Sequence, residues 1–152
     1  MAARKREEGE SHREFAVDLF NLAWTLMETR RRTREEDLRM IHAAHASRYH
    51  WEQVGSPKNL AIGEWQVSRV YAILRRAEPA LFHAKACLGI CRRHGLRDFP
   101  LAYAYEALAR ASAVAGDRRG RGRYLRLAER AGRGIREPED RALLLEDLRT
   151  VP

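Results

Sequence analysis

Cysteine is scarce in this chain of 152 residues, and long apolar segments are absent from it. Its two cysteines, Cys87 and Cys91, lie one helical turn apart on one expected helix, which gives no disulfide framework and fits a reducing cytoplasm. The N-terminal segment 1–13 is polar and charged and lacks the apolar core of a signal peptide. The longest apolar run, 99–116, contains Glu106 and Arg110, so we expect a buried helix there rather than a membrane span. We therefore expect a cytoplasmic protein that does not associate with membranes.

Lysine is almost missing from the basic residues, and glycine and proline are few. Only Lys5, Lys58 and Lys85 are lysines, so arginine carries nearly all of the positive charge. This fits nucleic-acid binding, a heat-loving host or a GC-rich genome, and composition does not distinguish these causes. The net charge of +8 favours acidic partners, which include nucleic acid, anionic lipid and acidic proteins.

No segment shows the alternating apolar pattern of a strand, whereas helical periodicity and helix-boundary signals recur along the chain. A capping box at Thr33–Glu36, Ser56-Pro57 and Asp117 each predict a helix start. Residues 1–13 are expected to be a disordered polar tail, and residues 14–152 a single all-α domain. The seven expected helices cover about residues 14–29, 34–54, 57–76, 78–94, 98–115, 118–132 and 138–148.

Two stretches of the chain share one pattern of large, small and packing residues. The first is Val67-Ser68, Tyr71, Ala80, Ala84 and Cys87, and the second is Leu108-Ala109, Ser112, Arg121, Leu125 and Ala128. The copies are offset by 41 residues, the separation of Ala128 from Cys87, which lies in the period range of helical repeat arrays. Such a unit buries its apolar face only by stacking on a neighbour, which leaves a long concave surface suited to binding.

These residues resemble the tetratricopeptide repeat (TPR). The second copy also has Gly116-Asp117 at its turn but departs from the pattern at Ser112 and Arg121, and the first has Arg75 in place of the turn glycine. A looser match lies near the N-terminus, at Leu22-Ala23, Leu26, Met40, Ala44 and Ser47. The resemblance implies antiparallel helical hairpins stacked as a short right-handed solenoid with a C-terminal capping helix. It also implies a non-enzymatic scaffold that binds a protein or peptide.

In this family the first helix of each repeat lines the concave groove. Carried over by position, the groove residues are Phe20, Trp24, Ile62, Trp65, Arg69, Tyr103, Glu106 and Arg110. We expect Arg69 and Glu106 to meet beside Trp65, because a charge on an apolar stripe is costly unless it is paired. In the alternative, the last helix fills the groove, the tryptophans are core residues and the ion pair is structural. That helix should pack some of Leu143, Leu144, Leu145 and Leu148 on the preceding hairpin.

Histidine and cysteine spacing offers few metal ligands. The candidates are His42, His45, His83 and Cys87, whose i, i+3 and i, i+4 spacings each supply two ligands. Packing explains them better, because a buried free cysteine behaves as a small hydrophobe. We expect no metal and no cofactor, and no spacing of a nucleophile and a base indicates an enzyme.

Arginine on the sixth expected helix supports a different function. Five arginines project to one side of that helix and could follow nucleic-acid phosphates: Arg119, Arg123, Arg126, Arg130 and Arg133. The solvent-facing side of an amphipathic helix is also polar without any ligand, and Glu129 interrupts the field. Nucleic-acid binding through this stripe is therefore the alternative to peptide binding, and the partner's identity and a homo-oligomeric state stay open.

Overall fold

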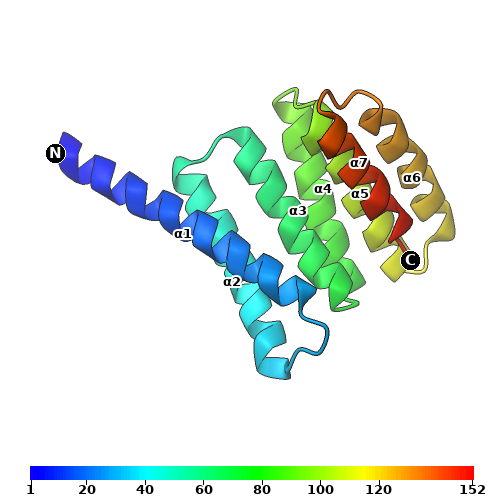
Figure 1. The fold of residues 1–152 in the computed structure, drawn as a ribbon, viewed down its shortest axis with the longest axis horizontal. Coiled ribbons are helices and arrows are strands. Elements are labelled where there is room, and N and C mark those ends of the chain that lie inside the picture. Colours follow the sequence, from blue (N-terminus) through cyan, green and yellow to red (C-terminus); the bar gives the residue numbers. More distant parts are fainter.

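The computed structural model describes the backbone of residues 1–152 and every side chain except those of Ala2 and Ala3. The described chain forms seven helices and no strand, which confirms the expected all-α class (Figure 1). The helices are α1 (Ala2–Glu28), α2 (Arg34–Val54), α3 (Pro57–Ile73), α4 (Ala77–Arg93), α5 (Asp98–Val114), α6 (Arg118–Gly132) and α7 (Pro138–Arg149).

Capping side chains, Thr33, Ser56 and Asp117, set the starts of α2, α3 and α6 where the sequence predicts them. The Thr33 hydroxyl accepts a hydrogen bond from the Glu36 amide at 3.2 Å, and the Glu36 carboxylate accepts one from the Thr33 amide at 2.7 Å. At α3, Ser56 makes a reciprocal box with Asn59, and Pro57 occupies the first turn. These side chains satisfy amide groups that have no partner within the first turn of a helix.

The first helix begins earlier than the sequence predicts. We expected a disordered tail over residues 1–13 and a helix from Glu14, whereas α1 begins at Ala2; the side chains of Ala2 and Ala3 lie outside the described residues. Arg4 pairs with Glu8 at 3.1 Å, one turn along the helix, and His12 lies 2.8 Å from His50 of α2. The expected start at Glu14 is therefore wrong, because i, i+4 pairing and packing on α2 continue the helix into polar sequence.

Three successive inter-helix turns share one backbone geometry. Arg75, Gly95 and Gly116 have φ values of 57°, 61° and 76°. In each turn the following amide bonds back to the carbonyl five residues before it: Arg76 to Tyr71 at 2.9 Å, Leu96 to Cys91 at 2.8 Å, and Asp117 to Ser112 at 2.9 Å. This is the Schellman motif, which normally places glycine at the left-handed position. Arg75 therefore adopts the conformation of the turn glycine that it replaces.

Sequential helices pack in pairs. α1 packs along α2, α3 along α4 and α5 along α6, and the pairs contact one another through α2–α3, α4–α5, α1–α3 and α3–α5. Buried side chains of α2 and α3 donate hydrogen bonds to backbone carbonyls of α1. Ser47 donates to the Ala16 carbonyl at 2.7 Å, and Gln66 donates to the Phe20 carbonyl at 2.9 Å. One apolar cluster lies among α3 to α7, and a second joins α1, α2 and α3. α3 thus belongs to both halves of the core.

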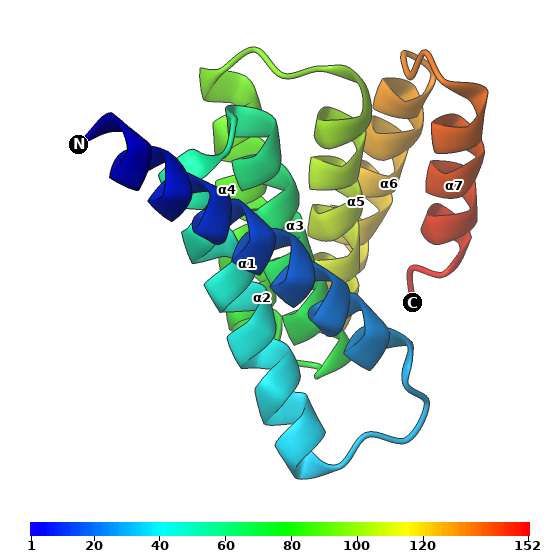
Figure 2. The same ribbon diagram turned by 60° about the vertical axis from the view of Figure 1, so that its left-hand side comes forward.

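The last helix packs on α5 and α6 (Figure 2). Leu144 and Leu148 are buried, whereas Leu143 and Leu145 are exposed, so two of the four leucines form the expected contact. A Cβ atom on Gly132 of α6 would lie 2.5 Å from Leu144, which shows how closely α6 and α7 approach.

The longest apolar run of the sequence lies in α5, whose side chains are mostly buried. Within the described residues, no helix combines the length and apolarity that a membrane crossing requires.

Candidate functional site

The eight predicted groove residues come from α1, α3 and α5, and the structure sorts them into two adjoining sets. Arg69, Glu106 and Arg110 form a polar cluster together with Trp65. Phe20, Trp24, Ile62, Trp65 and Tyr103 line an apolar pocket. Trp65 belongs to both sets, so the polar cluster and the pocket lie side by side.

Glu106 is the centre of the polar cluster. It is 0% exposed, and its carboxylate accepts hydrogen bonds from Trp65 Nε1 at 2.8 Å, Arg69 at 2.8 Å and Arg110 Nε at 2.7 Å. The predicted meeting of Arg69 and Glu106 beside Trp65 is confirmed. A buried carboxylate with two guanidinium partners and an indole donor has both of its oxygens occupied.

The far side of this cluster is closed by α7. Arg110 donates to the carbonyls of Asp147 and Thr150 at 3.0 and 3.1 Å and to the Thr150 hydroxyl at 2.8 Å. Arg69 also lies 3.8 Å from the Asp147 carboxylate. These contacts lie at the C-terminal end of α7, where the Asp147 carbonyl also accepts hydrogen bonds from the Thr150 amide and hydroxyl. They place α7 against the polar end of the predicted groove.

Tyr103 joins α5 to α7 by its hydroxyl, which donates to Asp147 at 2.7 Å. Burial and this hydrogen bond to a carboxylate raise the pKa of Tyr103 well above its ordinary value, so the hydroxyl stays protonated and remains a donor. Burial also lowers the pKa of Arg69, and the nearby charge of Glu106 opposes this effect.

Four aromatic rings, those of Trp24, Trp65, Tyr103 and Phe99, form the floor of the apolar pocket between α1 and α7. Trp24 stacks on Trp65 with ring centroids 5.9 Å apart, Trp65 meets the Tyr103 ring edge-on at 5.4 Å, and Tyr103 contacts Phe99 at 4.4 Å. Trp24 is 39% exposed although Trp65 is buried. A surface aromatic that stacks on a buried one is held rigidly and can contact a partner at little cost in side-chain entropy.

Two hollows adjoin this floor. The first, of about 150 Å³, is the apolar pocket, which Phe99, Leu143 and Asp147 complete. The second, of about 340 Å³, lies between α1, the end of α2 and the start of α3, and it includes Val17, Asn21, Trp51 and Lys58. Phe20 and Ile62 line both hollows, so the two hollows form one continuous trough along α1 and α3. We call this the aromatic trough.

The sequence analysis placed α7 at the groove only as an alternative, and it did not name Asp147, Thr150 or Phe99 as site residues. Asp147, Leu143 and Thr150 complete the pocket and the cluster, and Phe99 lies one turn before Tyr103 on α5. The excess of two arginines over one carboxylate in the predicted set was a signal that a second acidic partner, here Asp147, must lie nearby. The alternative of a groove filled by α7 therefore applies to the polar cluster and not to the aromatic trough.

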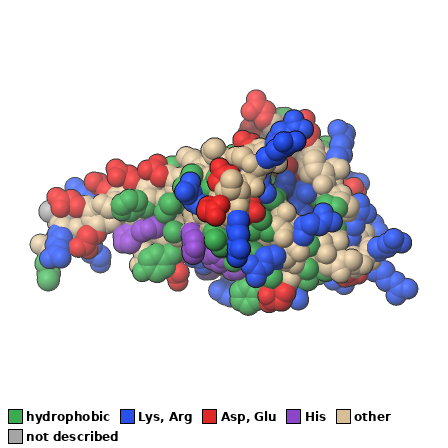
Figure 3. Space-filling model, turned by 90° about the horizontal axis from the view of Figure 1, so that it is seen from below, with side chains coloured by type: hydrophobic (Ala, Val, Ile, Leu, Met, Phe, Trp, Pro, Cys, Tyr) green, Lys and Arg blue, Asp and Glu red, His purple; other side chains and the backbone are tan. Residues whose placement is uncertain are grey.

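The predicted arginine stripe is exposed along α6. All five of its members, Arg119, Arg123, Arg126, Arg130 and Arg133, face solvent. Figure 3 shows Lys and Arg side chains gathered over the end of the molecule that α6 forms. Arg123 and Arg130 line two hollows between α4 and α6, together with basic residues of α4 rather than with the rest of the stripe.

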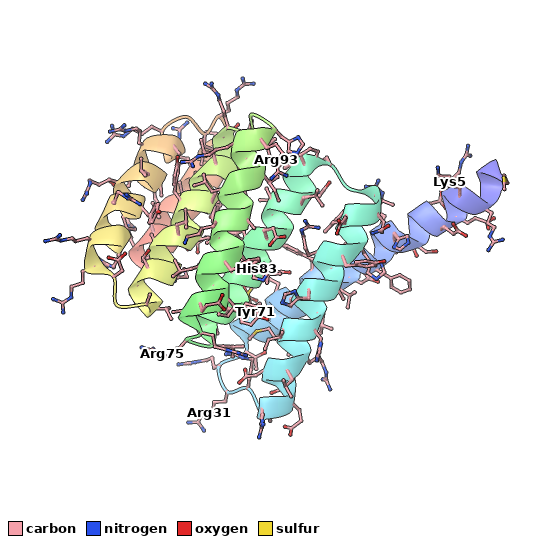
Figure 4. The ribbon with its side chains drawn as sticks, turned by 180° about the vertical axis from the view of Figure 1, so that it is seen from behind. Lys5, Arg31, Tyr71, Arg75, His83 and Arg93 are labelled. Carbon is pink, nitrogen blue, oxygen red and sulfur yellow. The ribbon has the colours of Figure 1, made fainter. Side chains whose placement is uncertain are left out.

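The candidate metal ligands have other partners, mostly on different helices. His45 shares a hydrogen bond with the Tyr71 hydroxyl at 2.9 Å, and His83 Nδ1 lies 2.7 Å from Glu64, which also accepts from Arg48 at 2.9 Å. Figure 4 shows Tyr71 and His83 near each other on this face. Burial and the neighbouring His83 lower the pKa of His45. Burial alone would raise the pKa of Glu64, but its bonds with His83 and Arg48 outweigh that effect and lower it.

The other two candidates do not join this group of residues. His42 is exposed, and Cys87 is fully buried. The pKa of Cys87 is raised by its hydrogen bond with Cys91 and by burial, which keeps the thiol protonated and a poor metal ligand. Among the described side chains, no group of three or more His, Cys, Asp or Glu residues has the geometry of a metal site.

A scan against protein-family models, a search of curated proteins and a search of solved structures each returned no match to this chain.

Proposed function

We propose that this chain is a short, right-handed, TPR-like solenoid of antiparallel hairpins capped by α7, and that it is a non-enzymatic interaction module. The 41-residue register supports the repeat, because Arg75 and Gly116 are one period apart and share the left-handed turn geometry. Arg69 and Arg110 are also one period apart, and both bind Glu106. Equivalent positions of the two copies thus have equivalent backbone and side-chain roles.

We propose that the module binds a peptide segment in the aromatic trough. The observation that carries this proposal is the apolar pocket beside the stacked Trp24 and Trp65, open to solvent next to a second hollow. Binding energy at protein interfaces concentrates where aromatic side chains surround a small desolvated pocket. An apolar cavity of about 150 Å³ can accommodate a benzene ring, so one phenylalanine or leucine side chain of a partner fits there.

Charge near the trough specifies the partner further. Lys58 is exposed at the end of the trough that the start of α3 forms, and the protein carries a net charge of +8. At the other end, the Asp147 carboxylate is already engaged by Tyr103 and lies near Arg69. The partner we propose is therefore a peptide with an apolar anchor for the pocket and an acidic side chain for Lys58.

A non-enzymatic role is supported by the bonding of the most buried ionisable groups. Glu106 is enclosed by three donors, and Arg110 donates to the end of α7 as well as to Glu106. Groups that are fully hydrogen-bonded to one another stabilise a fold but are poorly placed to exchange protons with a substrate.

A random peptide library displayed on phage tests the proposal when it is selected against the full chain. We expect enrichment of peptides that combine an aromatic or leucine anchor with an acidic residue. For a selected peptide measured by calorimetry, Trp24→Ala should weaken binding by about 30-fold, the loss typical of a central aromatic residue. Leu22→Ala is the matched control, because Leu22 is 38% exposed on the same helix but lines neither hollow, and its change should be nearly silent.

The role of Lys58 has its own test. Lys58→Gln should weaken selected peptides that contain the acidic residue and leave versions with that residue changed to glutamine unaffected. If selection enriches no common motif, or if the Trp24 and Leu22 variants bind equally, the aromatic trough is not a peptide site.

A further inference from the structure

A second groove lies away from the aromatic trough, between α4 and α6. α5 lies between these two helices in the fold (Figures 1 and 4). One hollow there, of about 670 Å³, extends from Cys91 of α4 to Arg130 of α6 and includes the loops at the ends of both helices. The next, of about 450 Å³, lies one to two turns further along the helices. Arg92 and Tyr105 line both hollows, which makes them one continuous groove.

The walls of this groove are strongly basic. Its six cations are Lys85, Arg92, Arg97, Arg123, Arg130 and Arg136, and its one acidic residue is Asp98. All six cations are exposed, and none forms an ion pair among the side chains that the structure describes. The groove therefore concentrates unneutralised positive charge in a concave site, where the electrostatic potential is focused.

Four of these cations are regularly spaced. Lys85 and Arg92 lie on α4 two turns apart, and Arg123 and Arg130 repeat this spacing on α6, about 10 Å along each helix axis. Lys85 and Arg123 line the same hollow, as do Arg92 and Arg130. Two rows of cations thus face one groove, which suits a ligand that carries a row of negative charges.

Aromatic rings lie between the rows. Tyr105 of α5 is half-buried in the groove, and Tyr124 of α6 lines it beside Arg123, whose guanidinium lies 4.7 Å from the ring centroid. Cationic walls with aromatic rings between them are the arrangement that binds single-stranded nucleic acid, because phosphates pair with the cations and unstacked bases pack on the rings. A duplex would hide its base faces from these tyrosines, and an acidic peptide would have little use for them.

We propose that the α4–α6 groove binds single-stranded nucleic acid through phosphate contacts from both helices and base stacking on Tyr105 and Tyr124. This site differs from the stripe that the sequence suggests, because Arg119, Arg126 and Arg133 lie outside the groove whereas Lys85 and Arg92 belong to it. It is separate from the peptide site, which α1, α2, α3, α5 and α7 form.

The first test measures the affinity of the full chain for oligo(dT) as a function of salt by fluorescence anisotropy. With four phosphate contacts, the logarithm of the binding constant should fall with the logarithm of salt concentration with a slope of about −3. The affinity should then drop about 50-fold between 50 and 200 mM salt. Failure to bind oligo(dT) at low salt, or tighter binding to a duplex of the same length, would overturn the proposal.

A matched pair of double variants separates the groove from overall charge. Arg92→Gln with Arg130→Gln removes two groove cations, and Arg119→Gln with Arg126→Gln removes the same charge from exposed positions outside it. We expect at least a ten-fold loss for the first variant and less than a three-fold loss for the second. Equal losses would mean that binding is diffuse, which contradicts a site in the groove.

Gly89 gives a further test that leaves every cation in place. It lines the groove on α4, and a Cβ atom there would meet nothing within 4 Å, so side chains can be added without disturbing the fold. Gly89→Glu should weaken oligo(dT) binding at least ten-fold more than the isosteric Gly89→Gln. Tyr124→Leu should weaken oligo(dT) and leave binding of polyglutamate unchanged. If polyglutamate binds as tightly as oligo(dT), or if Tyr124→Leu weakens both equally, the groove does not select nucleic acid.

Discussion

Replacing Glu106 by glutamine should strongly destabilise the protein. The substitution keeps the volume but removes the charge that faces Arg69 and Arg110 in a site with 0% exposure. The glutamine amide can accept hydrogen bonds at only one of its two positions, so at least one of the three donors around it loses its partner. Breaking a buried, hydrogen-bonded ion pair by removing one partner costs about 3–5 kcal/mol.

Urea unfolding followed by circular dichroism measures this loss. With a slope of about 2 kcal/mol per molar urea, a loss of about 4 kcal/mol lowers the midpoint by about 2 M. The same change at an exposed ion pair is the control: Glu8→Gln, whose carboxylate pairs with Arg4 on the surface of α1, should shift stability by less than about 0.5 kcal/mol.

A double variant tests whether the lost charge is the cause. Arg69→Met combined with Glu106→Gln should be more stable than the sum of the two single losses, with a coupling of about 1–3 kcal/mol, because the guanidinium is then no longer held without its carboxylate. A Glu106→Gln protein within about 0.5 kcal/mol of the wild type would refute the reasoning. Strictly additive losses would show that the buried charges do not depend on one another.

Three more predictions concern the core, a turn and pH. Leu144→Ala should cost about 2–5 kcal/mol because Leu144 is fully buried, while Leu145→Ala, at an exposed position of the same helix, should change the melting temperature by no more than about 2 °C. Arg75→Gly should stabilise the protein by up to about 1 kcal/mol in urea unfolding by relieving the positive φ, and Gly116→Ala should destabilise it for the same reason. Burial and a nearby imidazole lower the pKa of His45, so this side chain binds fewer protons in the folded than in the unfolded protein. The free energy of unfolding should therefore fall as pH drops below about 6.5. Urea midpoints measured from pH 7.5 to 5.5 should show this decline, and His45→Gln should flatten it.

Much of the helical structure follows from local signals in the sequence. The capping boxes at Thr33 and Ser56 place helix starts because a side-chain acceptor meets the amides of its own first turn. This contact depends only on residues that are close in the sequence. The start of α1 could not be placed in the same way, because its polar first turns are held partly by contact between His12 and His50 of another helix. Local composition contains no information about that contact.

The residues of the candidate site likewise separate into those that the sequence pattern predicts and those that depend on contacts between distant helices. The resemblance to the tetratricopeptide repeat predicted that Arg69, Trp65 and Glu106 face one groove from neighbouring helices, and the three side chains do meet. The excess of arginine over carboxylate indicates a second acidic partner, but the sequence does not identify it as Asp147, since α7 lies outside the repeat and nothing in its leucine pattern sets its rotation. The partners of His45 and His83 were missed because we compared ligands within single helices, whereas the structure pairs them across helices.

The three hydrogen bonds from Arg110 to Asp147 and Thr150 at the C-terminal end of α7 have a consequence for synthesis on the ribosome. α5 and its partner α6 emerge before α7, so Glu106 and Arg110 must wait for more than thirty further residues before their shell is complete. Until then Arg110 keeps several donors open to water, and the apolar faces of α5 and α6 that later receive Leu144 and Leu148 stay uncovered. The part of the nascent chain built on α5 and α6 should thus become tightly packed and protease-resistant only after α7 has emerged, while the α1–α2 pair can fold earlier.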